Sequence, residues 1–327
     1  MSETLVFGEM VGEVLSPITG ELFVAARTLG KESTVVLIGN KSGNASREAL
    51  DLGFDRVYVV ECDPLLEISN DYLVSAFEQV CRKVRPFIVL FGKTLVGKDV
   101  GPRVAFRLGV GVAQDCIDVS LDSSTGRIVA VRPVYGGSAY ATVTFTDVDP
   151  QMVVVRSGVF DTPEPDSTQN TGQIIKVEVE FDEADMKVRH VETVREESQG
   201  VRLEDASVVV AGGRGLGGAE PFRYLEELAA LLGGAVGASR AATDAGWIEH
   251  SLQIGLTGKT IAPNLYITVG ISGASQHMAG CAGAKSIVAV NKDSGANIFK
   301  DARFGVVGDW KKVYSGFMAT VQDLMNR

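Results

Sequence analysis

A polar cluster follows an apolar run in the segment LYITVGISGASQHMAG, residues 265–280. Residues 265–271 have the composition of a buried strand, and the residues after them include Ser272, Gly273, Ser275, Gln276 and His277. A glycine turn that leads from a strand into a helix leaves backbone N–H groups without intrahelical partners, and the helix dipole favours negative charge there. The pattern therefore predicts a large anionic ligand, with a pyrophosphate at the start of the helix. A serine N-cap without a ligand is the alternative.

Other polar residues stand in the same relation to a strand-like run. They are Arg214, the pair Ser239 and Arg240, Asn291 and Asp309. Ligands of doubly wound α/β folds bind beyond the carboxyl ends of the strands. The shared position of these residues, more than any single motif, predicts one binding edge.

A glycine triplet offers a competing interpretation. Gly213, Gly215 and Gly218 satisfy G-x-G-x-x-G after a strand and before a helix, which is the nicotinamide dinucleotide fingerprint. That fingerprint requires an acidic residue about twenty positions further on. The corresponding region holds Ser239 and Arg240 instead. An arginine there suits a 2′-phosphate, so an NADP-dependent oxidoreductase stays open as an alternative.

The elements that must position these residues alternate along the chain. From Leu5 to about Cys116, strand-like runs such as PFIVLFG flank helical patterns such as NDYLVSAFEQVCRKV, and this predicts βαβ units in a parallel sheet. The next three strand-like runs, GRIVAVRPVYG, SAYATVTFTD and PQMVVVRSGVF, leave little room for helices. We expect them to form an antiparallel extension of the first domain.

A second alternating series begins at Ala206 and predicts another doubly wound parallel sheet. A loop of solvated composition, residues 161–173, and a charged segment precede it. We therefore expect an α/β protein of two domains. Residues 1–195 form the N-terminal α/β domain and residues 196–327 the C-terminal ligand-binding domain.

Composition disfavours several classes of protein. The 31 Lys and Arg against 41 Asp and Glu give a net charge of −10, and a nucleic-acid surface needs clustered basic residues. The 4 cysteines and 3 histidines lack metal-ligand spacing, so no zinc site is expected. No apolar stretch approaches the length of a membrane span and no targeting leader is evident. We expect a cytoplasmic protein with reduced thiols.

Four segments of the second domain together resemble one protein family. They are VVVAGGRGLGG, AVGASRAATDAGW, QIGLTGKTIAPNLYITVGISGASQH and IVAVNKD, in this order. The combination is similar to the large (alpha) subunit of electron transfer flavoproteins and covers nearly all of the C-terminal domain. The segment LFGKTLVGKDVGPRVAFRLGVG of the N-terminal domain agrees more loosely. The chain departs from the usual sequence motif of the family at Ser275 and Cys281, where an aliphatic residue and a methionine are common.

The resemblance implies an alpha/beta heterodimer that carries FAD. In this family the C-terminal domain of the alpha subunit holds most of the cofactor, and the N-terminal domain contacts the beta subunit. The heterodimer accepts electrons from dehydrogenases, such as the acyl-CoA dehydrogenases of fatty acid β-oxidation, and passes them to a quinone reductase or another acceptor. Some relatives bifurcate electrons with a second FAD held largely by the beta subunit, so a bifurcating complex is an open alternative.

By family position, the residues expected at FAD are Arg214, Ser239, Arg240, Gln253, Thr257, Gly258, Ser272, Gly273, Gln276, His277, Asn291, Lys292 and Asp309. The resemblance implies that the Thr257 hydroxyl bonds flavin N5 and that His277 donates toward flavin O2. Arg240, beside the flavin, would stabilise the negative charge of one-electron reduction. Asn291 and Lys292 would face the adenosine half.

Each of these roles has a plain structural alternative. Arg214 would meet a phosphate or the ring edge, or lie on the surface without a ligand. The Thr257 segment would form only a turn, and His277 would be packed or solvated without function. Asp309 would lie near the adenine or cap the helix that follows it.

The sequence contains no motif that pairs a catalytic nucleophile with a general base. The expected task of the protein is to bind FAD and tune its potential, while the cofactor supplies the redox chemistry. A structural subunit that has lost its cofactor is the remaining alternative. The retained polar residues argue against it, because unused buried polar groups are costly.

Overall fold

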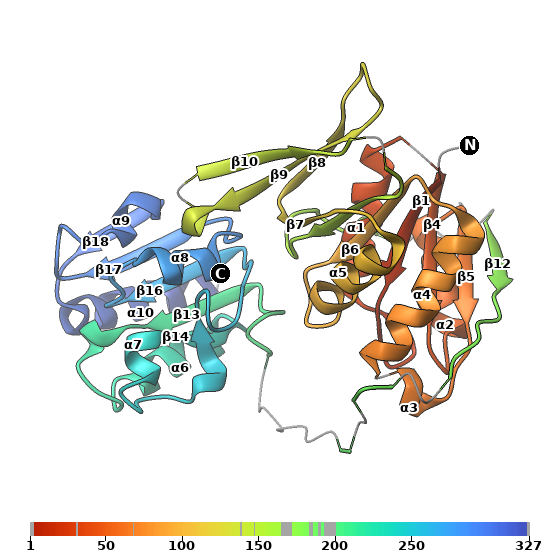
Figure 1. Cartoon of the computed structure of the whole chain (residues 1–327). Helices are drawn as coiled ribbons and strands as arrows, with labels where there is room; N and C mark the ends of the chain where they lie inside the picture. The colour runs from red at the N-terminus through yellow and green to blue at the C-terminus, as the bar shows by residue number, and fades with distance from the viewer. Residues whose placement is uncertain are drawn as a thin grey trace. The chain divides into compact units, whose positions relative to one another are not determined.

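In this computed structural model, two compact units divide the chain, Met1–Thr193 and Val194–Arg327 (Figure 1). The structure describes residues 3–30, 32–67, 69–137, 139–146, 148–164, 172–182, 186–188, 191–192 and 201–325. The domain boundary that we predict between residues 195 and 196 lies outside these ranges, as does most of the loop predicted at 161–173.

The first unit contains a seven-stranded sheet in which every neighbouring pair of strands is parallel. In spatial order the strands are β12 (Gln173–Lys176), β5 (Arg56–Val60), β4 (Glu32–Ile38), β1 (Glu3–Gly8), β6 (Ile88–Gly92), β11 (Gln151–Val155) and β7 (Val112–Cys116). The neighbouring strands β6 and β11 are buried along their whole length, as largely apolar runs predict for strands covered on both faces.

Helices cover both faces of this sheet (Figure 1). Their bounds are α1 (Pro17–Thr28) and α2 (Gly43–Leu52) on one face, and α4 (Asn70–Val84) and α5 (Gly97–Leu108) on the other. A single turn, α3 (Pro64–Glu67), precedes α4, and a small hairpin, β2 (Met10–Val11) with β3 (Val14–Leu15), precedes α1. Local signals set the helix ends: Pro17 occupies the first position of α1, and the Ser69 side chain caps α4.

The predicted antiparallel extension exists, but one of its three strands was assigned wrongly. It consists of β8 (Asp118–Leu121), β9 (Ile128–Val134) and β10 (Ala139–Thr144). The run PQMVVVRSGVF instead supplies β11, which is inserted between β6 and β7 of the parallel sheet. The physical reason is burial, because all five β11 residues lie in the core while β10 is largely exposed.

The second unit contains a six-stranded sheet, and all of its neighbouring strands are parallel. In spatial order they are β15 (Gln253–Ile254), β14 (Ala235–Ser239), β13 (Val208–Gly212), β16 (Leu265–Val269), β17 (Ile287–Asn291) and β18 (Phe304–Val307). The chain order reverses between β13 and β16, which is the switch point of a doubly wound fold. The predicted fold class is confirmed.

Two apolar clusters attach helices to the two faces of this second sheet (Figure 1). One face carries α6 (Phe222–Leu231), α7 (Arg240–Thr243) and α10 (Trp310–Met325), and the other carries α8 (Ser275–Cys281) and α9 (Ile298–Asp301). Short 3-10 turns follow β13 (Arg214–Leu216) and precede β15 (His250–Leu252). Within the ranges described, no helix is both long and apolar enough to cross a membrane.

Candidate functional site

The predicted site residues gather at one edge of the second sheet. The strand ends are in register, since Gly212 pairs with Val269 and Asn291 pairs with Val307. The predicted residues therefore follow the strands along a common edge: Arg214 after β13, Arg240 after β14, Thr257 after β15, Ser272 and Gly273 after β16, Lys292 after β17 and Asp309 after β18. From β14 to β18 this edge covers four interstrand spacings, about 19 Å. Only an extended ligand reaches along such an edge.

The turn after β16 presents a run of backbone donors. No described residue accepts a hydrogen bond from the backbone N–H groups of residues 272–276. The helix α8 begins at Ser275 and has Ala274 as its N-cap, so Ser272 does not cap it and its side chain is exposed. Backbone N–H groups without a partner among the described residues suit the oxygens of an anionic ligand.

The glycine in this turn is required by the chain itself. Gly273 has a φ of +77°, and a Cβ there would lie 2.2 Å from the backbone nitrogen of Ile298. The adjacent Ser272 carbonyl accepts a hydrogen bond from that same nitrogen at 3.1 Å. Close approach of the chain to itself, before any ligand is considered, explains the residue type.

The glycine triplet at 213–218 has a similar internal role. The N–H of Gly215 donates to the carbonyl of Gly270 at 3.0 Å, and that of Gly213 donates to Val269 at 2.9 Å. A Cβ on Gly213 would lie 2.3 Å from the Gly270 oxygen. These glycines pack two loops together, and two of the N–H groups that would cradle a nicotinamide dinucleotide are already used. The geometry argues against the NADP interpretation.

Gln253 and Thr257 lie in direct contact. The Gln253 Nε2 donates to the Thr257 Oγ1 at 3.0 Å, and the Gln253 Oε1 accepts from the Thr243 Oγ1 at 3.0 Å. Gln253 and Thr243 are buried, whereas Thr257 is exposed. Because the Thr257 oxygen accepts, its own hydrogen is available to a ligand at the edge.

His277 is buried, and both of its ring nitrogens have partners inside the protein. Nδ1 lies 3.0 Å from the carbonyl oxygen of Ile254, and Nε2 lies 2.8 Å from the hydroxyl of Tyr266. A carbonyl only accepts, so Nδ1 carries the proton and Nε2 accepts from Tyr266. Burial lowers the pKa of His277 from 6.5 to about 4, although the hydrogen bond to Ile254 opposes this shift. Burial also raises the pKa of Tyr266. A bond from His277 to a flavin would replace one of these contacts, and that bond stays a prediction.

The amide and carboxylate predicted at the adenosine half also bind the protein. The Asn291 Nδ2 donates to the Ile271 carbonyl at 2.8 Å, which fixes the start of the turn after β16. The Asp309 Oδ1 accepts from the Lys311 N–H at 3.0 Å, just before α10. The helix-cap alternative is thus confirmed for one Asp309 oxygen.

The edge carries the cations Arg214, Arg240 and Lys292 and also the carboxylates of Asp244 and Asp309. Arg214 and Lys292 are exposed and form no ion pair with any residue that the structure describes. Arg240 pairs with Asp244, at 3.2 Å between Nε and Oδ2, and its side chain is 68% exposed. Across the described ranges, no group of His, Cys, Asp or Glu could hold a metal ion.

Ser239, Gly258 and Gln276 complete the predicted set. Ser239 ends β14 beside Ile254 of β15, and Gly258 closes the turn that begins at Gly255. The Gln276 carbonyl accepts from the Leu256 N–H at 2.7 Å and joins this turn to α8. The side chain of Gln276 is exposed.

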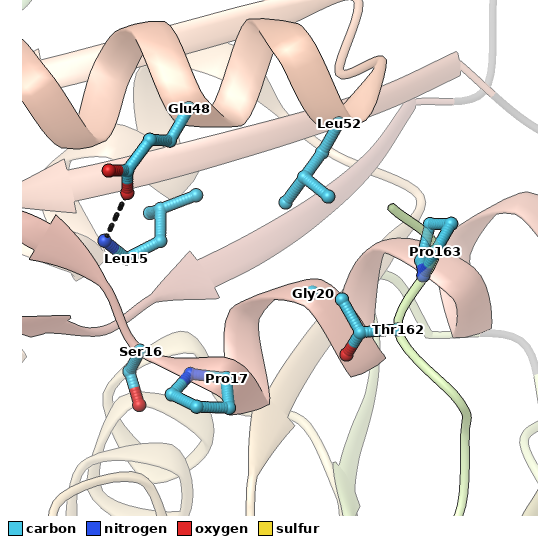
Figure 2. Close-up of a pocket in the computed structure, with 8 residues that line it drawn as sticks. All are labelled: Leu15, Ser16, Pro17, Gly20, Glu48, Leu52, Thr162 and Pro163. Carbon is cyan, nitrogen blue, oxygen red and sulfur yellow. Dashed lines mark hydrogen bonds between the residues drawn. The ribbon is translucent and has the colours of Figure 1, made fainter. Parts of the chain in front are cut away.

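A surface hollow in the first unit does not compete as a ligand site. Its volume is about 190 Å³, and Figure 2 shows it between the start of α1 and α2. Among its described lining residues only Glu48 is charged, and Glu48 Oε2 already accepts from the Leu15 N–H at 2.7 Å. Its other oxygen, Oε1, accepts from Asn44 Nδ2 at 3.0 Å, so both oxygens of this carboxylate are already hydrogen-bonded within the protein.

Two residues of the site escaped prediction from sequence. Thr243 orients Gln253, and Tyr266 orients His277. Thr243 lies in a short helix of ordinary composition, and Tyr266 lies in an apolar strand. No motif in the sequence distinguishes either residue, since the contacts are made across the fold.

Comparison with known proteins identifies two family domains in the chain. Residues 4–182 match the family described as the electron transfer flavoprotein domain, and residues 202–282 match the electron transfer flavoprotein FAD-binding domain. The chain is 39% identical over 323 residues to the electron transfer flavoprotein subunit alpha of Thermoanaerobacterium thermosaccharolyticum, covering 98% of this chain and 97% of that protein. It is 42% identical over 307 residues to the corresponding subunit of Megasphaera elsdenii, covering 92% and 89%.

A protein with a different name is also similar. Protein FixB of Azorhizobium caulinodans is 38% identical over 313 residues, covering 93% of this chain and 84% of that protein. The matched regions include every strand of both parallel sheets except β17 and β18, which the full-length relatives cover. The chain belongs to the electron transfer flavoprotein alpha subunit family.

Proposed function

We propose that this chain binds FAD along the carboxyl edge of its second sheet and carries electrons as the alpha subunit of a heterodimer with an electron transfer flavoprotein beta subunit. The observation that carries the proposal is the run of unpartnered N–H groups at residues 272–276, flanked by the exposed cations Arg214 and Lys292. Together they fit the phosphates of a dinucleotide. FAD, when bound, supplies the one- and two-electron chemistry.

The chain's own residues would bind and tune the cofactor. The Thr257 hydroxyl, which accepts from Gln253, would donate its hydrogen to the flavin ring. Arg240 would place positive charge beside the ring, and its pairing with Asp244 would moderate that charge. Asn291 would act indirectly, because its amide holds the turn after β16 through the Ile271 carbonyl.

The proposed partners are based on membership of the family. We propose that a dehydrogenase, such as an acyl-CoA dehydrogenase of fatty acid β-oxidation, supplies the electrons, and that a quinone reductase or another acceptor takes them. The first unit would contact the beta subunit. We propose a cytoplasmic setting, because the cysteines form no disulfide among the described residues. The alternative is a bifurcating complex, in which the beta subunit holds a second FAD.

The test is to co-express the chain with the beta subunit, record the absorption spectrum and count the extracted flavin. One FAD per heterodimer supports a simple carrier, and two support the bifurcating alternative. A colourless complex that cannot be reconstituted with FAD would refute the proposal. Reversal of Arg214 and Lys292 to Glu should weaken FAD binding by more than tenfold, whereas the same change at exposed Arg202 should have little effect.

A further inference from the structure

We propose that Thr243 is a positioning residue that acts through Gln253 and sets whether the Thr257 hydroxyl donates or accepts a hydrogen bond at the flavin. This inference rests on the proposed FAD site. The three side chains form a linear chain of contacts, with 3.0 Å between Thr243 Oγ1 and Gln253 Oε1 and 3.0 Å between Gln253 Nε2 and Thr257 Oγ1.

The amide of Gln253 has few choices of partner. Thr243 is 1% exposed and Gln253 is 6% exposed, so water does not compensate for a lost bond. Thr243 and Thr257 are the only described side chains that hydrogen-bond this amide. Its orientation is therefore decided by which of the two hydroxyls donates to it.

The structure gives Thr243 two acceptors for one hydrogen. Its Oγ1 lies 3.0 Å from Gln253 Oε1 and also 3.0 Å from the carbonyl oxygen of Arg240. When Thr243 donates to Gln253, the amide nitrogen faces Thr257, and Thr257 must donate outward. When Thr243 donates to Arg240, a half-turn of the amide presents its nitrogen to Thr243, and Thr257 donates inward and accepts from outside. The half-turn exchanges the amide oxygen and nitrogen without moving other heavy atoms.

These two arrangements match the two needs of a flavin ring. The N5 position is a hydrogen-bond acceptor in the oxidised ring and an N–H donor after full reduction. The first arrangement offers N5 a donor, and the second offers it an acceptor. The relay lets one set of residues satisfy both states, and it depends on a hydroxyl at position 243.

The variant Thr243→Val removes that hydroxyl with little change of shape. Gln253 is then left with either an unpaired oxygen or an unpaired N–H facing the valine, and buried orphan N–H groups are the rarer of the two in proteins. The variant therefore favours the arrangement in which Thr257 donates. We expect reduced FAD to bind about fivefold more weakly relative to oxidised FAD, which lowers the two-electron midpoint potential by about 20 mV.

The experiment measures the midpoint potential, and the dissociation constants of oxidised and reduced FAD, in the co-purified heterodimer. The conservative variant Thr243→Ser should retain the wild-type values. In a Gln253→Met background, Thr243→Val should cause no further shift, because the route to Thr257 is cut. Thr243→Ala serves as a second hydroxyl-free variant if the valine variant does not fold.

Two results would overturn the inference. One is an unchanged potential in Thr243→Val while Thr257→Val shifts it. The other is a Thr243→Val shift that persists undiminished in the Gln253→Met background. Either result leaves the FAD proposal standing, since both are measured on flavin-loaded protein. Failure of the wild-type complex to bind FAD would instead refute the proposed function.

Discussion

The buried histidine His277 makes the second unit sensitive to acid, and the size of the effect follows from its surroundings. In the folded chain Nδ1–H donates to Ile254, Nε2 accepts from Tyr266, and burial lowers the pKa of His277 to about 4, from 6.5. Protonation would place a second N–H against the Tyr266 hydroxyl in a buried position. Because the folded pKa is depressed, the stability that neutral His277 contributes is complete above pH 6.5 and is lost as the pH falls toward 4.

The lowering of the His277 pKa from 6.5 to about 4 corresponds to a contribution of roughly 3 kcal/mol to the free energy of unfolding. About 2 kcal/mol of it should be lost between pH 7 and pH 4.5. The variant His277→Gln keeps a donor for Ile254 and an acceptor for Tyr266 but cannot be protonated in this range. It should therefore lack this part of the pH dependence.

The assay is urea unfolding at pH 7 and at pH 4.5, followed by tryptophan fluorescence. Both tryptophans, Trp247 and Trp310, belong to the second unit, so the signal reports the unit that holds His277. The matched control is His250→Gln, since His250 is exposed in the same unit. The reasoning is refuted if wild type and His277→Gln lose stability in parallel as the pH falls.

Three further predictions follow from single contacts. Arg240→Ala should lower the first one-electron potential of bound FAD by roughly 40 to 90 mV, equivalent to about 1–2 kcal/mol. Asp244→Asn, which releases Arg240 from its ion pair, should raise that potential. Unchanged potentials in a redox titration would show that Arg240 does not stabilise charge on the flavin. Gly273→Ala should lower the free energy of unfolding in urea by about 2 kcal/mol or more, because the new Cβ would meet the backbone of Ile298. Gly217 also has a positive φ but has open space around it, so Gly217→Ala should lower the free energy of unfolding by only about 1 kcal/mol. Equal losses in the two variants would contradict the steric argument. Burial raises the pKa of Glu9 to about 7, although the hydrogen bond from Thr94 opposes this shift, so the stability contributed by protonated Glu9 is present below pH 4.5 and is lost as the pH rises through 7. The variant Glu9→Gln should therefore be more stable than wild type by about 2 kcal/mol at pH 8 and similar to it at pH 4.5. Equal stability of the two proteins at pH 8 would disprove this.

Local sequence patterns determined the α/β class of both units and the strand ends that polar residues follow. Short β-branched runs that alternate with helical periods specify βαβ units, and polar residues just after such runs necessarily lie at the carboxyl edge of a parallel sheet. For this reason Arg214, Arg240, Ser272 and Asn291 could be placed at one edge from the sequence alone. The roles of these residues toward FAD stay predictions.

Neighbour relations were decided only by the tertiary structure. The sequence of β11 does not say that it pairs between β6 and β7, because strand pairing is a long-range choice among similar apolar runs. The contact from Thr243 to Gln253 and the enclosure of His277 by Tyr266 and Ile254 depend on elements brought together by folding. Burial and hydrogen-bond partners set the charge and the donor or acceptor state of these groups, and neither property exists until the chain has folded.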